Sequence, residues 1–93
     1  MTPQRMSFRV HGDVQGVGFR RFAQREAQAL DLAGWVRNEL DGSVRGEVEG
    51  PNAALEAFRA RLAEGPAFGR VDRLDWTPLD VRSSLPHPFE IRR

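Results

Sequence analysis

The chain is organised around one short stretch, Gln15-Gly16-Val17-Gly18-Phe19-Arg20. It joins a predicted strand at residues 6–12 to a predicted helix at residues 20–30. Glycine adopts backbone angles that side chains disfavour, so the two glycines allow the loop to fold its N–H groups around an anion. The positive N-terminal end of the helix and the fork-shaped Arg20 guanidinium face the same place. The stretch therefore predicts a small phosphate site.

A glycine pair before a helix is also common as simple turn geometry, without any ligand. Arg20 favours the binding interpretation, because the positive end of the helix dipole repels an arginine in the first turn unless an anion lies between them. Local conflicts of this kind are expected at functional sites.

The apolar residues on either side of this stretch have two different periods. Before it, Met6, Phe8 and Val10 alternate with polar residues, which predicts a half-buried strand after a polar lead-in at residues 1–5. After it, the period becomes helical, and the solvent-facing positions would be Arg21, Arg25, Glu26 and Gln28. The predicted inward stripe of this helix is Phe19, Phe22, Ala23, Ala27 and Leu30.

A hairpin and a second helix follow. Asp41-Gly42, a favoured tight-turn pair, separates predicted strands at residues 33–40 and 44–49. Gly50-Pro51 predicts the start of a helix that ends near Gly65-Pro66. A fourth strand is predicted at residues 71–79. The remaining inward positions are Leu55, Phe58 and Leu62 on the helix, with Phe89 and Ile91 on a short last strand.

This element order predicts an α+β fold over a single domain, residues 1–93. Strand, helix, strand, strand, helix, strand is the ferredoxin-like βαββαβ sandwich, here with a short extra C-terminal strand. The sheet would be mostly antiparallel with both helices on one face, which explains the apolar and polar sides of each strand.

Composition excludes several kinds of chemistry. The chain has no cysteine, so disulfides, thiolate nucleophiles and cysteine-based zinc sites are absent. All 14 basic residues are arginine, which excludes lysine Schiff bases and the lysine-containing phosphate loop. A formal charge of +1 gives little support to nucleic-acid binding. With no apolar run near the ~20 residues of a membrane span and no signal-like sequence, we expect a cytoplasmic protein that does not bind membranes. No large apolar patch is evident, so a monomer is the default expectation.

Outside the loop, Asn38 is the residue of most interest. It falls late in the second predicted strand, where asparagine is disfavoured. It is either an exposed polar residue beside the turn or a functional residue that reaches the glycine loop across the open end of the sheet. His11 and His87 lack metal-ligand spacing and are predicted to be exposed and structural. Trp35 and Trp76 are predicted to pack in the core or on a sheet face.

With these residues assembled, the sequence resembles the acylphosphatase family over nearly its whole length. One part of the match is Val10-x-Gly12-x-Val14-Gln15-Gly16-Val17-Gly18-Phe19-Arg20. A second part is Gly34-Trp35-Val36-x-Asn38-x-x-Asp41-Gly42-x-Val44, and a third comprises Gly46, Gly50-Pro51 and Phe89-x-Ile91-Arg92.

The resemblance implies hydrolysis of a small-molecule acyl phosphate to a carboxylate and inorganic phosphate, with no metal and no cofactor. Arg20 and Asn38 would be the catalytic residues: Arg20 would hold the phosphate and Asn38 would position the attacking water. The backbone N–H groups that would hold the phosphate with Arg20 are those of Gln15, Gly16, Val17, Gly18, Phe19 and Arg20.

The chain departs from the family pattern at two positions. Asp31 stands where many members have a glycine after the first helix, and aspartate tolerates the left-handed conformation less well. Asp13 stands at a loop position where a basic residue is common, and its charge would weaken the attraction of an anionic substrate. Neither departure affects Arg20 or Asn38.

Two other functions compete with this one. Many ferredoxin-like domains bind RNA through aromatic residues on the central strands. RNA binding is disfavoured here because no aromatic residue occurs among the exposed central-strand positions, Ser7, Arg9, His11, Arg45, Glu47 and Glu49.

An acylphosphatase-like domain also begins the large carbamoyltransferases of hydrogenase maturation. We expect a freestanding enzyme instead, because this chain ends at the natural close of the domain.

Overall fold

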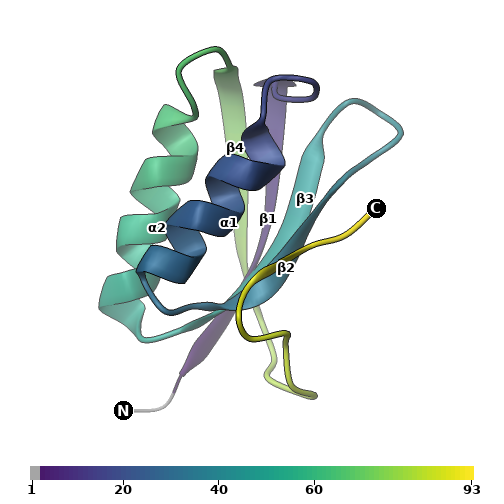
Figure 1. The fold of residues 1–93 in the computed structure, drawn as a ribbon. Helices are drawn as coiled ribbons and strands as arrows, with labels where there is room; N and C mark the ends of the chain where they lie inside the picture. Colours follow the sequence, from purple (N-terminus) through teal and green to yellow (C-terminus); the bar gives the residue numbers. More distant parts are fainter. Residues whose placement is uncertain (1–2) are drawn as a thin grey trace.

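The computed structural model describes residues 3–93 and confirms the predicted order of elements (Figure 1). The helices are α1 (Phe19–Ala29) and α2 (Asn52–Glu64). The strands are β1 (Gln4–Asp13), β2 (Ala33–Asn38), β3 (Val44–Gly50), β4 (Arg70–Leu79) and β5 (Glu90–Ile91).

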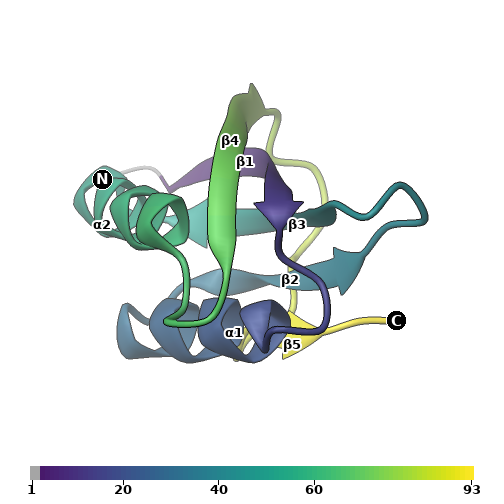
Figure 2. The same ribbon diagram turned by 90° about the horizontal axis from the view of Figure 1, so that it is seen from above.

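The strands form one sheet in the order β4-β1-β3-β2-β5. Every neighbouring pair is antiparallel except β2 and β5, which are parallel. Both helices lie on one face of the sheet (Figure 1), and the view from above shows the first turn of α1 beside the loop that leaves β1 (Figure 2). The ferredoxin-like α+β fold predicted from the sequence is confirmed. Within the described residues, neither helix has the length and apolar character needed to cross a bilayer.

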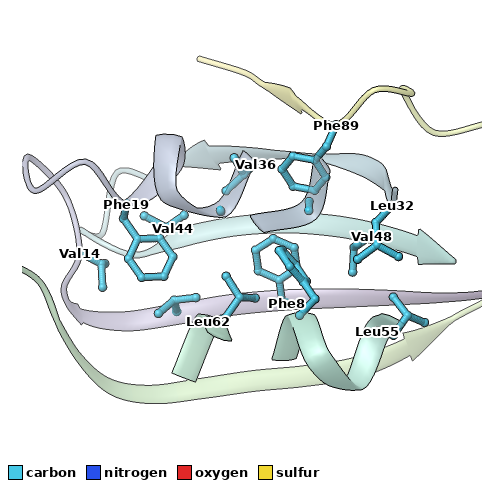
Figure 3. Packing of buried hydrophobic residues seen from close by; sticks show 14 residues of the cluster. Phe8, Val14, Phe19, Leu32, Val36, Val44, Val48, Leu55, Leu62 and Phe89 are labelled. Carbon is cyan, nitrogen blue, oxygen red and sulfur yellow. The ribbon is translucent and has the colours of Figure 1, made fainter. Parts of the chain in front are cut away.

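The core lies between the helices and the sheet and is centred on Phe8 (Figure 3). The Phe8 ring lies 5.7 Å from the ring of Phe58 on α2 and 6.4 Å from that of Trp76 on β4. Gly46 is the residue opposite Phe8 on β3. A Cβ atom at Gly46 would come within 2.4 Å of Phe8 Cζ and 2.2 Å of the Trp35 carbonyl oxygen. Gly46 therefore leaves the space that the central ring occupies.

The polar lead-in predicted at residues 1–5 is wrong at its C-terminal end. β1 begins at Gln4, and Arg5 is only 5% exposed. Its guanidinium lies 2.9 Å from Glu49 Oε1 on β3 and also donates to the Ser83 carbonyl oxygen. These acceptors allow a cation to be buried at a strand position, because a buried charge is tolerated when it is paired and hydrogen-bonded. Residues 1 and 2 lie outside the described residues.

The turn after β2 is longer than predicted. β2 ends at Asn38 rather than at residue 40, because the chain closes a loop in which Glu39 N–H donates to the Ser43 carbonyl at 2.8 Å. Within this loop, the Ser43 hydroxyl and N–H donate to Asp41 Oδ1 at 2.6 and 2.9 Å. These hydrogen bonds from Ser43 hold the pKa of the Asp41 carboxyl below its usual value. The turn from Glu39 to Ser43 is thus fixed by its own hydrogen bonds.

Asp31, which stands where many family members have a glycine, adopts a left-handed conformation with a φ of 57°. It follows the C-cap residue Leu30 of α1, and Leu32 N–H donates back to the Ala27 carbonyl at 2.9 Å. Asp31 Oδ1 also lies 2.8 Å from His87 Nε2. A non-glycine residue is strained at this angle, although aspartate adopts it more readily than most residues.

We expect Gly46→Ala to destabilise the fold, because the added methyl would have to displace both the Phe8 ring and the backbone of β2. Overpacking of this kind lowers the free energy of unfolding by about 1–3 kcal/mol. Urea denaturation followed by tryptophan fluorescence would measure the change. Glu56→Ala on the exposed side of α2 is the control and should shift stability by less than about 0.5 kcal/mol. An unchanged urea midpoint for Gly46→Ala would contradict the proposed crowding.

Candidate functional site

The candidate site lies where β1 and β2 end. Both strands run antiparallel to β3, so they run parallel to each other and finish at the same edge of the sheet. Val10, Val44 and Asn38 form one row across β1, β3 and β2. Figure 1 shows the loop after β1 and the turn after β2 at this same end of the molecule. The edge therefore brings Asn38 and the glycine loop together, although they are far apart in sequence.

The loop between β1 and α1 has the backbone angles that glycine permits. Gly16 and Gly18 have φ values of 76° and 81°, both left-handed. A Cβ atom at either position would meet nothing within 4 Å, so the backbone angle and not the space requires glycine. Val14 and Phe19, each 1% exposed, anchor the two ends of the loop in the core.

The backbone N–H groups of this region form a set of available donors. Gly18 is the N-cap of α1, and its carbonyl accepts from Phe22 N–H at 3.0 Å. Within residues 3–93, the N–H groups of residues 15–21 donate to no backbone carbonyl. The first N–H groups of any helix lack partners inside the helix, and here the preceding loop extends that set.

The helix α1 begins at Phe19, one residue earlier than predicted, so Arg20 is its second residue. Its Nη1 donates to the Arg92 carbonyl at 3.3 Å, which holds the guanidinium near the end of β5. The first turn of α1 contains no acidic residue. The positive charge of Arg20 is thus added to the positive end of the helix dipole without a compensating carboxylate in that turn.

Asn38 is the last residue of β2 and is half-buried. Alternate residues of a strand share a face, so Asn38 lies on the same face as Val36, which is fully buried against the helices. Its carboxamide is therefore on the helix-bearing side of the sheet, toward the first turn of α1. A residue at this position, on the buried face of a strand, would ordinarily be apolar.

A depression of about 230 Å³ brings these groups together. It contains two guanidinium groups, one carboxamide and the loop glycines, and no acidic or histidine side chain lines it. Such a set of donors suits an anion. The lining residues are Val14, Gly16, Gly18, Phe19, Arg20, Arg21, Asn38 and Ile91.

The remaining predicted loop residues, Gln15 and Val17, do not line the depression. The Gln15 side chain donates to the Glu39 and Ser43 carbonyls, and Val17 packs against the core. Sequence reasoning missed Arg21 and Ile91 as lining residues. The position of Arg21 directly after Arg20 in the first turn could have indicated its role from the sequence. The place of Ile91 could not be predicted locally, because it depends on β5 pairing with β2.

The other polar candidates lie outside this depression. His11 Nε2 is 2.9 Å from Asp75 Oδ2 and 3.0 Å from Arg73 Nη2. The hydrogen bond with His11 is the main cause that holds the pKa of Asp75 below its usual value. Asp13 is the last residue of β1, opposite Arg70, and not a loop residue as predicted. Residues 3–93 hold no cluster of three His, Cys, Asp or Glu side chains that would bind a metal.

Trp35 lies on the face of the sheet that the helices leave open, opposite to buried Val36. It is only 6% exposed, since the guanidinium groups of Arg37, Arg45 and Arg92 lie 5.1, 5.7 and 5.1 Å from its ring. The sheet-face packing predicted for Trp35 is confirmed. The covered ring does not offer a surface on which a nucleic-acid base would stack.

A larger hollow of about 550 Å³ lies elsewhere, and its lining mixes both signs of charge. Arg5 and Arg82 share it with Glu47 and Asp80. Its charges therefore offset one another, whereas the charged side chains that line the depression at Arg20 are all positive.

Comparison with known proteins agrees with the sequence and the fold. The family model described as acylphosphatase matches residues 6–91. An acylphosphatase from Salinibacter ruber is 49% identical over 92 residues, which is 99% of this chain and 96% of that protein. The crystal structure of acylphosphatase from Bacillus subtilis has a TM-score of 0.92 at 38% identity, covering 97% of this chain and 99% of that one.

A crystal structure of full-length HypF in a phosphate- and nucleotide-bound form is also similar, with a TM-score of 0.85 at 29% identity. The match covers 99% of this chain but only 12% of that one. The fold thus occurs both in proteins of this length and as a small part of a much longer protein. On the extent of the family match and the identity to its relatives, the chain belongs to the acylphosphatase family.

Proposed function

We propose that the chain hydrolyses the carboxyl-phosphate bond of acyl phosphates, with Arg20 and Asn38 acting on one bound phosphoryl group. The observation that carries the proposal is that both residues line the same depression at the first turn of α1. One chain supplies every group of this site, so the proposed active form is a monomer.

In this proposal, Arg20 and the loop N–H groups bind the phosphoryl oxygens. A guanidinium offers two parallel N–H donors that match two phosphoryl oxygens, and charge-assisted hydrogen bonds of this kind are the strong ones. The phosphoryl group also supplies the anion that the first turn of α1 lacks. Phosphoryl transfer depends mainly on positioning and on neutralising the charge on these oxygens, which is the chemistry that these donors provide.

Asn38 would orient the attacking water. A carboxamide carries both an acceptor and donors, so it can hold a water molecule in one orientation beside the phosphoryl group. The water oxygen forms a bond to phosphorus while the bond between phosphorus and the acyl oxygen breaks, and the carboxylate leaves with the electron pair. One proton of the water passes to solvent or to a phosphoryl oxygen, which gives inorganic phosphate.

The proposed reaction uses neither a protein acid nor a metal ion. The leaving group is a carboxylate whose conjugate acid has a pKa of about 4, so it departs at neutral pH without being protonated. The lining of the depression matches this requirement, since it consists of apolar, amide and guanidinium side chains.

The substrate class is tested by measuring phosphate release from acetyl, benzoyl and carbamoyl phosphate, with glycerol 2-phosphate, an alkyl phosphomonoester, as the control. We expect rapid turnover of the acyl phosphates and little of the monoester, because the monoester has a poorer leaving group. Turnover of the monoester alone would overturn the proposed function.

Arg20→Lys is expected to remove most of the activity, although it preserves the charge, because a lysine cannot make the two parallel contacts of a guanidinium. Loss of one such contact to the transition state costs about 10²- to 10³-fold in kcat. Acetyl phosphate hydrolysis would be measured beside Arg25→Lys, an exposed change on the same helix that should behave as wild type. Near-normal turnover by Arg20→Lys would remove the role assigned to Arg20.

Asn38→Ala is expected to lower kcat by about 10²-fold, since the water loses its orienting partner. The inhibition constant of inorganic phosphate should hardly change, because the phosphate contacts come from the loop and from Arg20. Asn52→Ala, at the exposed start of α2, is the matched control. If Asn38→Ala weakened phosphate inhibition but preserved kcat, Asn38 would be a phosphate ligand and not a water-positioning residue.

A further inference from the structure

The side chain of Gln15 points out of the glycine loop and into the turn that follows Asn38. Its Nε2 donates to the Glu39 carbonyl at 2.7 Å and to the Ser43 carbonyl at 2.9 Å. Glu39 is the residue directly after Asn38, and Ser43 directly precedes β3. One amide group therefore joins the loop after β1 to both ends of the turn between β2 and β3.

This contact crosses a gap that the sheet does not bridge. β1 pairs with β3 and β4, whereas β2 pairs with β3 and β5. β3 separates the two strands, so their ends are about two strand spacings, or about 10 Å, apart. The glycine loop and Asn38 consequently share no sheet hydrogen bond. Gln15 spans the distance by way of the turn.

The turn is already held from the opposite side of the sheet. The Glu39 carboxylate lies 3.3 Å from Arg9 Nη2, 3.0 Å from Arg37 Nε and 3.9 Å from Arg45 Nη1. These three arginines belong to β1, β2 and β3, so the ion pairs tie the turn to the strands. What Gln15 adds is the placement of the turn relative to the loop.

We propose that Gln15 is a positioning residue that fixes the distance between the bound phosphoryl group and the water held by Asn38. The inference rests on the proposed function, because it takes the loop as the phosphate site and Asn38 as the water-positioning residue. A reacting group displaced by about 1 Å can lose about 10²-fold in rate, so loss of the contact that places the turn relative to the loop would affect the chemical step.

The test uses Gln15→Met, which preserves the length of the side chain but removes both N–H donors. We expect kcat for acetyl phosphate to fall about 10-fold or more, within the loss that misplacement causes. Inhibition by inorganic phosphate should be unchanged. In the Asn38→Ala background the same substitution should have almost no further effect on kcat, because residues that act as a unit are non-additive.

Gln28→Met is the matched control. The Gln28 Nε2 also donates to a backbone carbonyl, that of Phe89, at 3.0 Å, but it lies outside the depression. It should retain the wild-type kcat. If Gln15→Met does not fold, Gln15→Asn carries the same test, since its amide is one methylene shorter and cannot reach both carbonyls.

Two results would overturn the role of Gln15 alone. One is a wild-type kcat in the folded Gln15 variant. The other is an equal loss of kcat with Asn38 present and absent, which would mean that Gln15 acts on the loop and not through Asn38. An inactive wild-type protein, or an Asn38→Ala variant with normal kcat, would instead overturn the proposed function and with it this role.

Discussion

The candidate site depends on the row of backbone pairing that aligns Val10, Val44 and Asn38. Val10 and Val44 are fully buried on the helix-bearing face, so the hydrophobic core fixes the register of all three strands. A slip of β2 by one residue would turn Asn38 to the opposite face, away from the first turn of α1. The position of a polar residue at the site is therefore set by apolar burial elsewhere in the same row.

The electrostatics of the loop are unfavourable without a ligand. Arg20 adds a cation to the positive end of α1, and no carboxylate in that turn offsets it. The Arg92 carbonyl is the acceptor that the fold provides for this guanidinium, at a long 3.3 Å. Binding of an anion would relieve the repulsion between Arg20 and the helix end. The fold thus preorganises positive charge in the absence of substrate, which is the arrangement that favours developing negative charge.

Local patterns in the sequence were enough to predict the elements and their order, since periodicity and turn chemistry act over a few residues. The ties between distant segments could not be predicted in this way. Burial of Arg5 depends on Glu49 and Ser83, and the contact of Gln15 with the turn depends on strand order. Asn38 was recognisable as a polar residue out of place, but only the strand pairing puts its side chain beside the loop. The sequence was thus enough to predict which residues form the proposed site, but not how far apart they lie in the fold.

The size and lining of the depression suggest how such a site would select its substrate. At about 230 Å³ it is small, and if Arg20, Asn38 and the loop held the phosphoryl group and the water, few lining side chains would remain to contact the acyl portion. Discrimination between acyl phosphates and monoesters would then come from the leaving group. A carboxylate departs unprotonated, whereas an alkoxide requires an acid that this lining does not contain. In the proposed reaction, therefore, selectivity for the bond resides in the absence of a proton donor, and selectivity among acyl groups is expected to be weak.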